Sequence, residues 1–281
     1  MKLFRILLPL ALLAILPLTF LKAEPQDAKP ASATSKPLKA LLIAGGCCHD
    51  YLKQHEVLYK GIQARANVQV DVMWTRDKST NPPLPVYDTD DWAEGYDIII
   101  HDECAAHNKD LKVMDRILEV HKTIPAVHLH CAMHSFRNGT DKWQKHLGLH
   151  STGHGPQKPL EITYTNNDHP ITKGLENWTT KNEELYNNRE VFDIEPIAMA
   201  TQKVRDRENT AIVAWTNTKS GAPSFSTTVG HNTYTVEDPR YLDFITRGLL
   251  WAAGQLNDDY LVPYTGENVV TEMTAKKKAL K

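Results

Sequence analysis

The chain contains a short, almost wholly apolar run that two glycines close, "KALLIAGG" at 39–46. Because this run has no polar alternation, it predicts a parallel strand buried on both faces. Similar runs follow at "YDIIIHDE" (96–103) and "IPAVHLHC" (124–131), and "VQVDVMW" (68–74) alternates as a strand does. These runs constrain the fold strongly, since neighbouring parallel strands must be joined by a long crossover, usually a helix.

Helical patterns lie between these strands. "HEVLYKGIQARA" (55–66) and "LKVMDRILEVHK" (111–122) place apolar residues at helical spacing. The alternation of strand and helix predicts an α/β fold with a doubly wound, mainly parallel sheet and right-handed crossovers. The second half adds a closing helix at 238–256 and four strand patterns, at 160–165, 195–201, 210–216 and 223–231.

The two ends of the chain do not share this pattern. Residues 1–23 have a basic start, an apolar middle and a terminal alanine, which predicts a signal peptide and export to the periplasm or beyond. A membrane anchor is the rival interpretation, but the apolar run is short and holds two prolines, so we expect no stable membrane insertion after cleavage. We expect a disordered linker at 24–38, one domain at 39–263 and a basic flexible tail at 264–281.

Charge and cysteine content bound the partners and the redox chemistry. The formal net charge of −2 argues against a nucleic-acid surface. Each of the four cysteines stands at the end of an apolar run: Cys47, Cys48, Cys104 and Cys131. Such residues are either small buried hydrophobes or, in an exported protein, members of a disulfide, and their spacing does not decide between the two.

Polar clusters follow several predicted strands. They are "GGCCHD" (45–50), "HDEC" (101–104), "HLHCAMHS" (128–135) and the end of "TTVGH" (227–231). In open α/β sheets, ligands bind outside the carboxyl ends of the strands, so these clusters predict a site at one edge. The candidate histidines are His49, His130, His134, His154, His169 and His231.

The other histidines have plainer interpretations. His128 is predicted to be a core residue behind the site rather than a ligand. His169 precedes Pro170, where capping a turn is a sufficient explanation. Surface positions in helices or loops are predicted for the remaining ones considered, His55, His107, His121 and His146.

Two kinds of chemistry fit the predicted edge. Imidazoles at 130, 134 and 231 suit a divalent ion such as zinc or manganese, although no compact motif such as HExxH is present. Cys131 stands where a nucleophile turn would, between a strand and a helix, but the glycines that such a turn favours are missing. No nucleotide cofactor is indicated.

Six motifs resemble, in the same order, those of the ThuA-like (trehalose utilisation) family, over about residues 39–254. The resemblance implies a flavodoxin-like fold similar to that of the class I glutamine amidotransferases, without their glutaminase activity, since the glycine-flanked elbow is absent. The motifs are "LLIAGGCCHD", "AVHLHCAMHSF", "WQKHLGLHSTGH", "HPITKGL", "EELY" and "TTVGHNTYTVEDPRYLDFITRGLLWAAG".

The resemblance also marks site residues. It implies catalytic roles for Glu184 and His154, and it includes Gly45 at the first strand. Metal ligation is assigned to His130 and His231, together with His134, which departs from the commoner family pattern. Substrate contacts are predicted for Gly46, His49, Asp50 and Tyr186.

The family resemblance implies carbohydrate metabolism, with a small carbohydrate as partner and the oligomeric state open. One glutamate among imidazoles is a poor match to glycoside hydrolysis by two acids, and it suits proton abstraction next to a carbonyl. We therefore expect an isomerase or lyase acting on disaccharides or keto-sugar glycosides, assisted by a metal or by an imidazolium. The alternatives are a carbohydrate-binding module without chemistry and, as a minor option, a cysteine hydrolase or amidase using Cys131.

Overall fold

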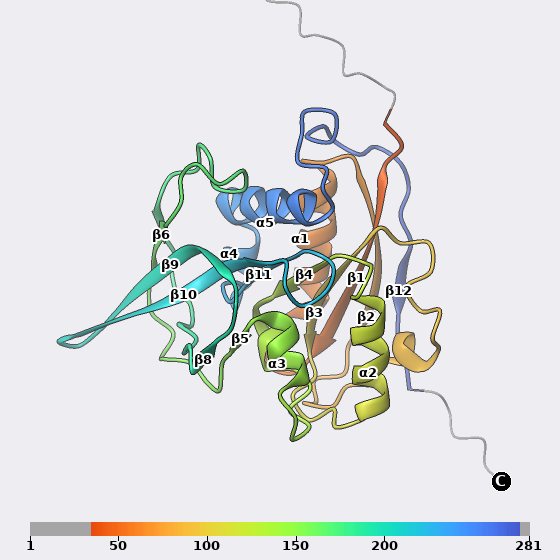
Figure 1. Ribbon diagram of the computed structural model, residues 1–281, viewed down its shortest axis with the longest axis horizontal. Helices are drawn as coiled ribbons and strands as arrows, with labels where there is room; N and C mark the ends of the chain where they lie inside the picture. The colour runs from red at the N-terminus through yellow and green to blue at the C-terminus, as the bar shows by residue number, and fades with distance from the viewer. Residues whose placement is uncertain (1–34, 276–281) are drawn as a thin grey trace, which may run out of the picture. The chain divides into compact units, whose positions relative to one another are not determined.

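The computed structural model describes residues 35–275 (Figure 1). The predicted signal peptide, and the predicted linker up to residue 34, lie outside the described residues. Within 35–275, no helix is long and apolar enough to span a bilayer.

The core is one ten-stranded sheet whose first six strands run parallel. β1 (Leu38–Gly46) is central, and its side chains alternate between two cores: Leu42 packs on one face and Leu41 and Ile43 on the other. This double burial explains why its sequence is a continuous apolar run. In spatial order the parallel strands are β12 (Val270–Glu272), β2 (Val68–Thr75), β1, β3 (Ile98–Cys104), β4 (Ala126–Leu129) and β11 (Ser224–Thr227).

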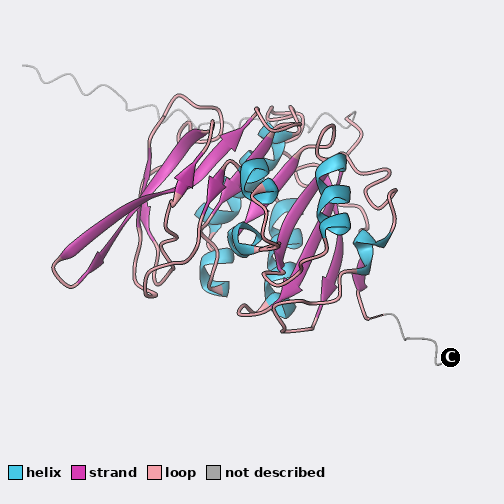
Figure 2. Ribbon diagram, turned by 60° about the horizontal axis from the view of Figure 1, so that its bottom comes forward, coloured by secondary structure: helices cyan, strands magenta, loops and turns pink. Residues whose placement is uncertain are grey.

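Helices cover both faces of this sheet, as a doubly wound fold requires (Figures 1 and 2). α1 (Tyr51–Gln63) and α5 (Pro239–Ala252) pack together on one face. α2 (Leu111–Val120) and α3 (Lys142–Leu147) cover the other. Short helical turns complete the set: η1 (Pro85–Asp88), η2 (His130–His134) and α4 (Thr233–Val236).

The sheet continues beyond β11 as an antiparallel extension, which Figure 2 shows projecting from the parallel part. Its strands alternate between buried and exposed residues, as expected where one face meets water. In order they are β10 (Arg207–Asn217), β9 (Glu195–Val204), β6 (Glu161–Tyr164) and β7 (Trp178–Thr179). A separate pair is formed by β5 (Leu149–His150) and β8 (Glu190–Val191).

The end of the chain differs from the predicted flexible tail at 264–281. Val270–Glu272 forms β12, which pairs in parallel with β2 and so closes one edge of the sheet. Met273 is buried in the core beside α2 and α3. The sequence did not predict this strand because it is three residues long and mostly exposed, so it has no apolar run.

Three of the histidines predicted on the surface are buried instead, His55, His121 and His146, whereas His107 is exposed. His121 accepts or donates a hydrogen bond at 2.8 Å to His101, and its ring stacks on that of His146. Burial lowers the pKa of His121 well below its ordinary value, and the same holds for His128. These rings are therefore neutral packing groups, which for His128 confirms the predicted core role.

The order of the strands creates a switch point. The chain passes from β1 to β2 on one side and then returns to β3 on the other side of β1. In a flavodoxin-like sheet, ligands bind outside the carboxyl ends of the strands at this place. The loops after β1, β3 and β4 are therefore the place where a ligand site is expected.

Candidate active site

The loop after β1 needs glycine to reach the switch point. Gly46 has φ +104°, and a Cβ on it would collide with the backbone carbonyl of Cys104 at the end of β3. Only glycine allows both the positive φ and the close approach. This contact sets His49 beside the ends of β3 and β4.

A second bend follows β4. His130 has φ +39° at the turn from β4 into η2, an uncommon conformation for a residue with a side chain. Cys131 was a candidate for a nucleophile turn, but the positive φ belongs to His130, and Cys131 forms a disulfide with Cys104. The residue that this bend presents to the edge is thus an imidazole.

Glu184 lies at the centre of the site and is almost fully buried. Its carboxylate oxygens lie 3.3 Å from His231 Nδ1, 3.5 Å from His154 Nδ1 and 3.8 Å from His130 Nε2. These side chains come from segments far apart in the sequence. One buried carboxylate therefore faces three imidazoles.

The protonation states follow from this arrangement. Burial alone would raise the pKa of Glu184, but the hydrogen bond and charge of His231 bring it below its ordinary value. Burial alone would lower the pKa of His231, but Glu184 raises it. Burial, with the His231 charge, lowers the pKa of His49 to about 4, and burial lowers that of His130 well below its ordinary value. The arrangement therefore favours an ionised Glu184, which stabilises the protonated form of His231, beside neutral His49 and His130 rings.

Backbone carbonyls fix the tautomers of the two neutral rings. Because a carbonyl can only accept, His130 Nδ1 donates to the carbonyl oxygen of Thr228 at 2.6 Å, and His49 Nδ1 donates to that of His231 at 3.4 Å. The Nε2 atoms of both rings are left as acceptors. The Tyr186 hydroxyl lies 3.2 Å from His130 Nε2. A carbonyl behind the ring is typical of metal-binding histidines.

The rings are also close enough to share an ion. His49, His130 and His231 each offer a nitrogen within 4.8 Å of the others. The residues present therefore fit a divalent metal. His134, the third predicted ligand, is placed differently: its Nε2 bonds Ser151 Oγ at 2.9 Å and its ring stacks on Tyr186.

Two further residues, which were not predicted from the sequence, position this site. Glu183 is buried and accepts hydrogen bonds from the backbone N–H groups of His231, at 3.0 Å, and Asn232, at 3.2 Å. The Gln157 amide lies 2.7 Å from His231 Nε2. Because an amide can flip, it can donate to the neutral ring or accept from the protonated one. The only signal in the sequence was the doubled glutamate of "EELY", which does not say which glutamate faces the site.

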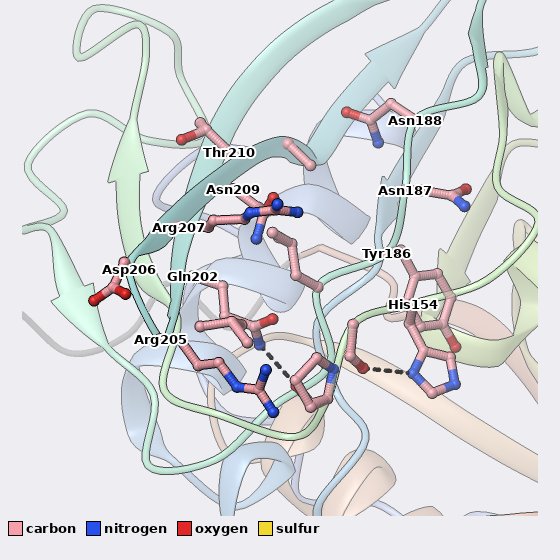
Figure 3. Close-up of a pocket in the computed structure, with 15 residues that line it drawn as sticks. His154, Tyr186, Asn187, Asn188, Gln202, Arg205, Asp206, Arg207, Asn209 and Thr210 are labelled. Carbon is pink, nitrogen blue, oxygen red and sulfur yellow. Dashed lines mark hydrogen bonds between the residues drawn. The ribbon is translucent and has the colours of Figure 1, made fainter.

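Two cavities meet at His154 and Tyr186, which line both of them. The smaller, about 260 Å³, also contains Glu184, His49, His134 and His231. The larger, about 910 Å³, lies over the antiparallel extension (Figure 3). Its wall carries several amide and guanidinium groups: Asn187, Asn188, Gln202, Arg205, Arg207 and Asn209.

Other predicted residues lie apart from Glu184. Gly46 and Asp50 line a separate hollow of about 100 Å³ with Arg76 and Lys78. His49 lines both this hollow and the cavity that contains Glu184. The backbone carbonyl of Asp50 accepts the first hydrogen bonds of α1. His169 accepts from the N–H of Ile171, which is the predicted turn cap. The substrate and metal roles of Gly46, Asp50 and His134 stay predictions.

Fold and site together define a class: a flavodoxin-like α/β protein whose sheet carries a histidine–glutamate site at its switch point. The chain belongs to the ThuA family, described as trehalose utilisation, which matches residues 39–252. The predicted family and fold class are thereby confirmed, and the family connects the chain with carbohydrate utilisation.

Two solved structures of ThuA-like proteins share the fold at low sequence identity. A ThuA-like protein from Parabacteroides merdae is 20% identical, with a TM-score of 0.61 over 78% of this chain and 90% of that one. A ThuA-like protein from Bacteroides uniformis is 17% identical, with a TM-score of 0.57 over 80% and 95%. A glutamine amidotransferase from Thermotoga maritima is 12% identical, with a TM-score of 0.38 over 79% and 96%. No curated protein matches the chain.

Proposed function

We propose that this protein is an enzyme that abstracts a proton next to the carbonyl of a keto-sugar glycoside or oxidised disaccharide, leading to isomerisation or elimination. The observation that carries the proposal is the buried Glu184 carboxylate, held ionised between imidazoles at the edge of the sheet. A general base must be unprotonated and within reach of the substrate, and Glu184 lines a cavity open to solvent.

The groups around Glu184 suit the negative charge that develops on the substrate. When Glu184 takes the proton, negative charge moves to the carbonyl oxygen, and the His231 imidazolium stabilises it. His154, whose side chain is 42% exposed, lies at the junction of the two cavities and can pass a proton to a departing sugar oxygen. His49 and Tyr186 shape the wall against which the reacting ring would lie.

Hydrolysis by two carboxylic acids has less support. Among the described residues that line the smaller cavity, Glu184 is the single carboxylate. Glu183, its neighbour, is turned toward backbone N–H groups and has a pKa that burial raises. An acid pair on opposite sides of a glycosidic bond is therefore not formed by these two residues.

The size of the larger cavity favours a substrate with more than one ring. Its amides and guanidinium groups can hydrogen-bond sugar hydroxyls, while the reacting ring occupies the smaller cavity beside Glu184. The description of the family, trehalose utilisation, supports a disaccharide as the parent compound.

Metal assistance is the second form of this proposal. Zinc or manganese held by His49, His130 and His231 would polarise the substrate carbonyl, while Glu184 keeps the role of base. Metal analysis of the purified full chain without a histidine tag separates the two forms. Near-stoichiometric metal that His130→Ala removes supports the metal form, and full turnover in metal-free protein contradicts it.

The test of the proposal is turnover of oxidised disaccharides, followed by chromatography and by exchange of the α-proton with deuterated water. We expect Glu184→Gln to lower turnover by about 10²–10⁴-fold, the usual contribution of a general base. Glu176→Gln, an exposed carboxylate, is the matched control. Tight binding of an unchanged sugar without proton exchange would favour a carbohydrate-binding module instead, for which the polar wall of the larger cavity is the supporting observation.

A further inference from the structure

All four cysteines converge at the switch point. Cys47 and Cys48 follow β1, Cys104 ends β3 and Cys131 follows β4. The structure pairs them as two disulfides, Cys47–Cys48 and Cys104–Cys131. The two disulfides also touch, because Cys47 Sγ lies 3.5 Å from Cys104 Sγ. This cluster plays no part in the chemistry assigned to Glu184.

Two overlapping sets of atoms that could hold a metal ion lie at the switch point. The sulfurs of Cys47, Cys48 and Cys104 lie within 4.8 Å of one another, and so do the ligand atoms of His49, Cys104 and Cys131. Cys104 is common to both sets and is buried. The His49 ring turns its Nδ1 to the His231 carbonyl, so its Nε2 is available.

The backbone is bent to bring these groups together. Gly45 and Gly46 at the end of β1 and Cys48 in the loop after it all have positive φ, and so does His130 after β4. Cys47 and Cys131 are buried as well, whereas Cys48 is exposed. Cys47, Cys104 and Cys131 line the 260 Å³ cavity, so an ion can enter from solvent.

We propose that, when its cysteines are reduced, this protein binds a thiophilic metal ion, Zn²⁺ or Cu⁺, through Cys104, Cys131, Cys47 and His49. Bond lengths of about 2.3 Å to sulfur place neighbouring sulfurs of a tetrahedral site about 3.8 Å apart, close to the separation of Cys47 and Cys104. Thiolates and imidazole are the ligands that such ions prefer.

The chemistry balances with a named reductant. Each disulfide takes two electrons and two protons from two external thiols, which become one external disulfide, or from one phosphine and water, which become a phosphine oxide. The three cysteine thiols then lose their protons to solvent as the ion binds, while His49 ligates as the neutral ring. With both disulfides formed, the cysteines offer no thiolate, so the site can bind the ion only after reduction.

Cobalt(II) is a suitable probe, because a thiolate ligand gives it an intense near-ultraviolet charge-transfer absorption that imidazole ligands do not. The full chain is reduced with a phosphine without oxygen, freed of reductant and titrated with Co²⁺. We expect this absorption to saturate at one equivalent in reduced protein and to be absent from oxidised protein. Its absence from reduced protein would overturn the proposal, without any variant being needed.

Variants test the ligand assignment. Cys104→Ser should lower the Co²⁺ affinity at least about tenfold, and Cys131→Ser serves if Cys104→Ser does not fold. Cys48→Ser tests the choice of Cys47 over Cys48. The Cys48 sulfur also lies within 4.8 Å of those of Cys47 and Cys104, but the side chain is exposed and outside the proposed four ligands, so this variant should retain the affinity. An equal loss in Cys48→Ser would contradict the assignment.

A last variant separates this site from the proposed function. His231→Ala removes an imidazole of the Glu184 site but none of the four proposed ligands, so the charge-transfer absorption should remain. If the absorption disappears in His231→Ala, the thiolate-bound ion also depends on His231, and the proposed set of four ligands is wrong. Failure of the keto-sugar assay, in contrast, leaves the result with Co²⁺ unchanged.

Discussion

At the scale of single residues, the site depends on one ion pair in a setting that would otherwise disfavour both charges. Glu184 is buried, which penalises its ionised form, and His231 is partly buried, which penalises its protonated form. Each charge is retained because the other lies 3.3 Å away. Neither residue would hold its protonation state alone.

This dependence predicts how His231 titrates. Its pKa is raised, so the ring should stay protonated above the ordinary value of about 6.5, and the ion pair should lose its contribution to stability as the pH rises through the folded pKa. The Glu184 pKa is lowered, so the pair should also be lost when the pH falls through that pKa, below about 4.3. Nuclear magnetic resonance titration of the His231 ring measures its folded pKa, which sets the upper pH limit of the ion pair.

The matched variants are Glu184→Gln and Glu176→Gln. Glu184→Gln removes the charge beside His231, and the His231 pKa should fall. Glu176→Gln changes an exposed carboxylate and should leave the His231 titration as in the wild type. A wild-type His231 that loses its proton below pH 6.5 would show that burial outweighs Glu184.

At the scale of elements, strand ends and the loops after them carry the site. β1, β3 and β4 stop within a residue or two of a bend, and the bends supply His49, Cys104 and His130. Close approach between the loop after β1 and the end of β3 is possible because residue 46 has no side chain. The geometry of the site is therefore set by backbone contact.

Gly46→Ala tests this contact against a matched glycine. Gly95 also has positive φ, but a Cβ there would meet open space, so Gly95→Ala should cost only the strain of the left-handed region, about 1–2 kcal/mol. Gly46→Ala adds a collision with the Cys104 carbonyl and should lower the free energy of unfolding by clearly more than Gly95→Ala. Urea denaturation of both variants measures the difference, and equal losses would contradict the role given to this contact.

At the scale of the whole described region, the parallel sheet and its antiparallel extension line different cavities. The parallel part ends in the Glu184 cavity, and the extension, with the segment from His154 to Asn188, lines the larger one (Figure 3). His154 and Tyr186 belong to both cavities. A two-ring substrate would therefore touch both parts of the sheet.

Arg207→Ala tests this division. Arg207 lines the larger cavity and lies apart from Glu184, so its loss should raise KM for an oxidised disaccharide by about tenfold, a typical value for one hydrogen-bonding group, with little change for a single-ring keto-sugar. Lys203→Ala, an exposed cation on β9 paired with Glu208, is the control. Equal effects on both substrates would place the second ring elsewhere.

The sequence by itself determined the main strands, the helices α1, α2 and α5, and the edge of the sheet where the candidate site lies, because apolar periodicity and strand ends are local signals. The strands predicted at 39–46, 68–74 and 96–103 are observed at 38–46, 68–75 and 98–104, and "EELY" marked the segment that holds Glu184. β12 was missed, since a strand of three mostly exposed residues is held by its partner β2 and not by its own composition.

Only the tertiary structure decided which polar residues meet. His121 and His146 looked like surface residues, but other rings cover them, and no local pattern records that burial. The choice of His130 over Cys131 at the bend, the orientation of Glu184 rather than Glu183 toward the imidazoles, and the meeting of four sulfurs each depend on contacts between segments far apart in the chain. Spacing along the sequence does not give these distances, because the crossover connections between the strands set them.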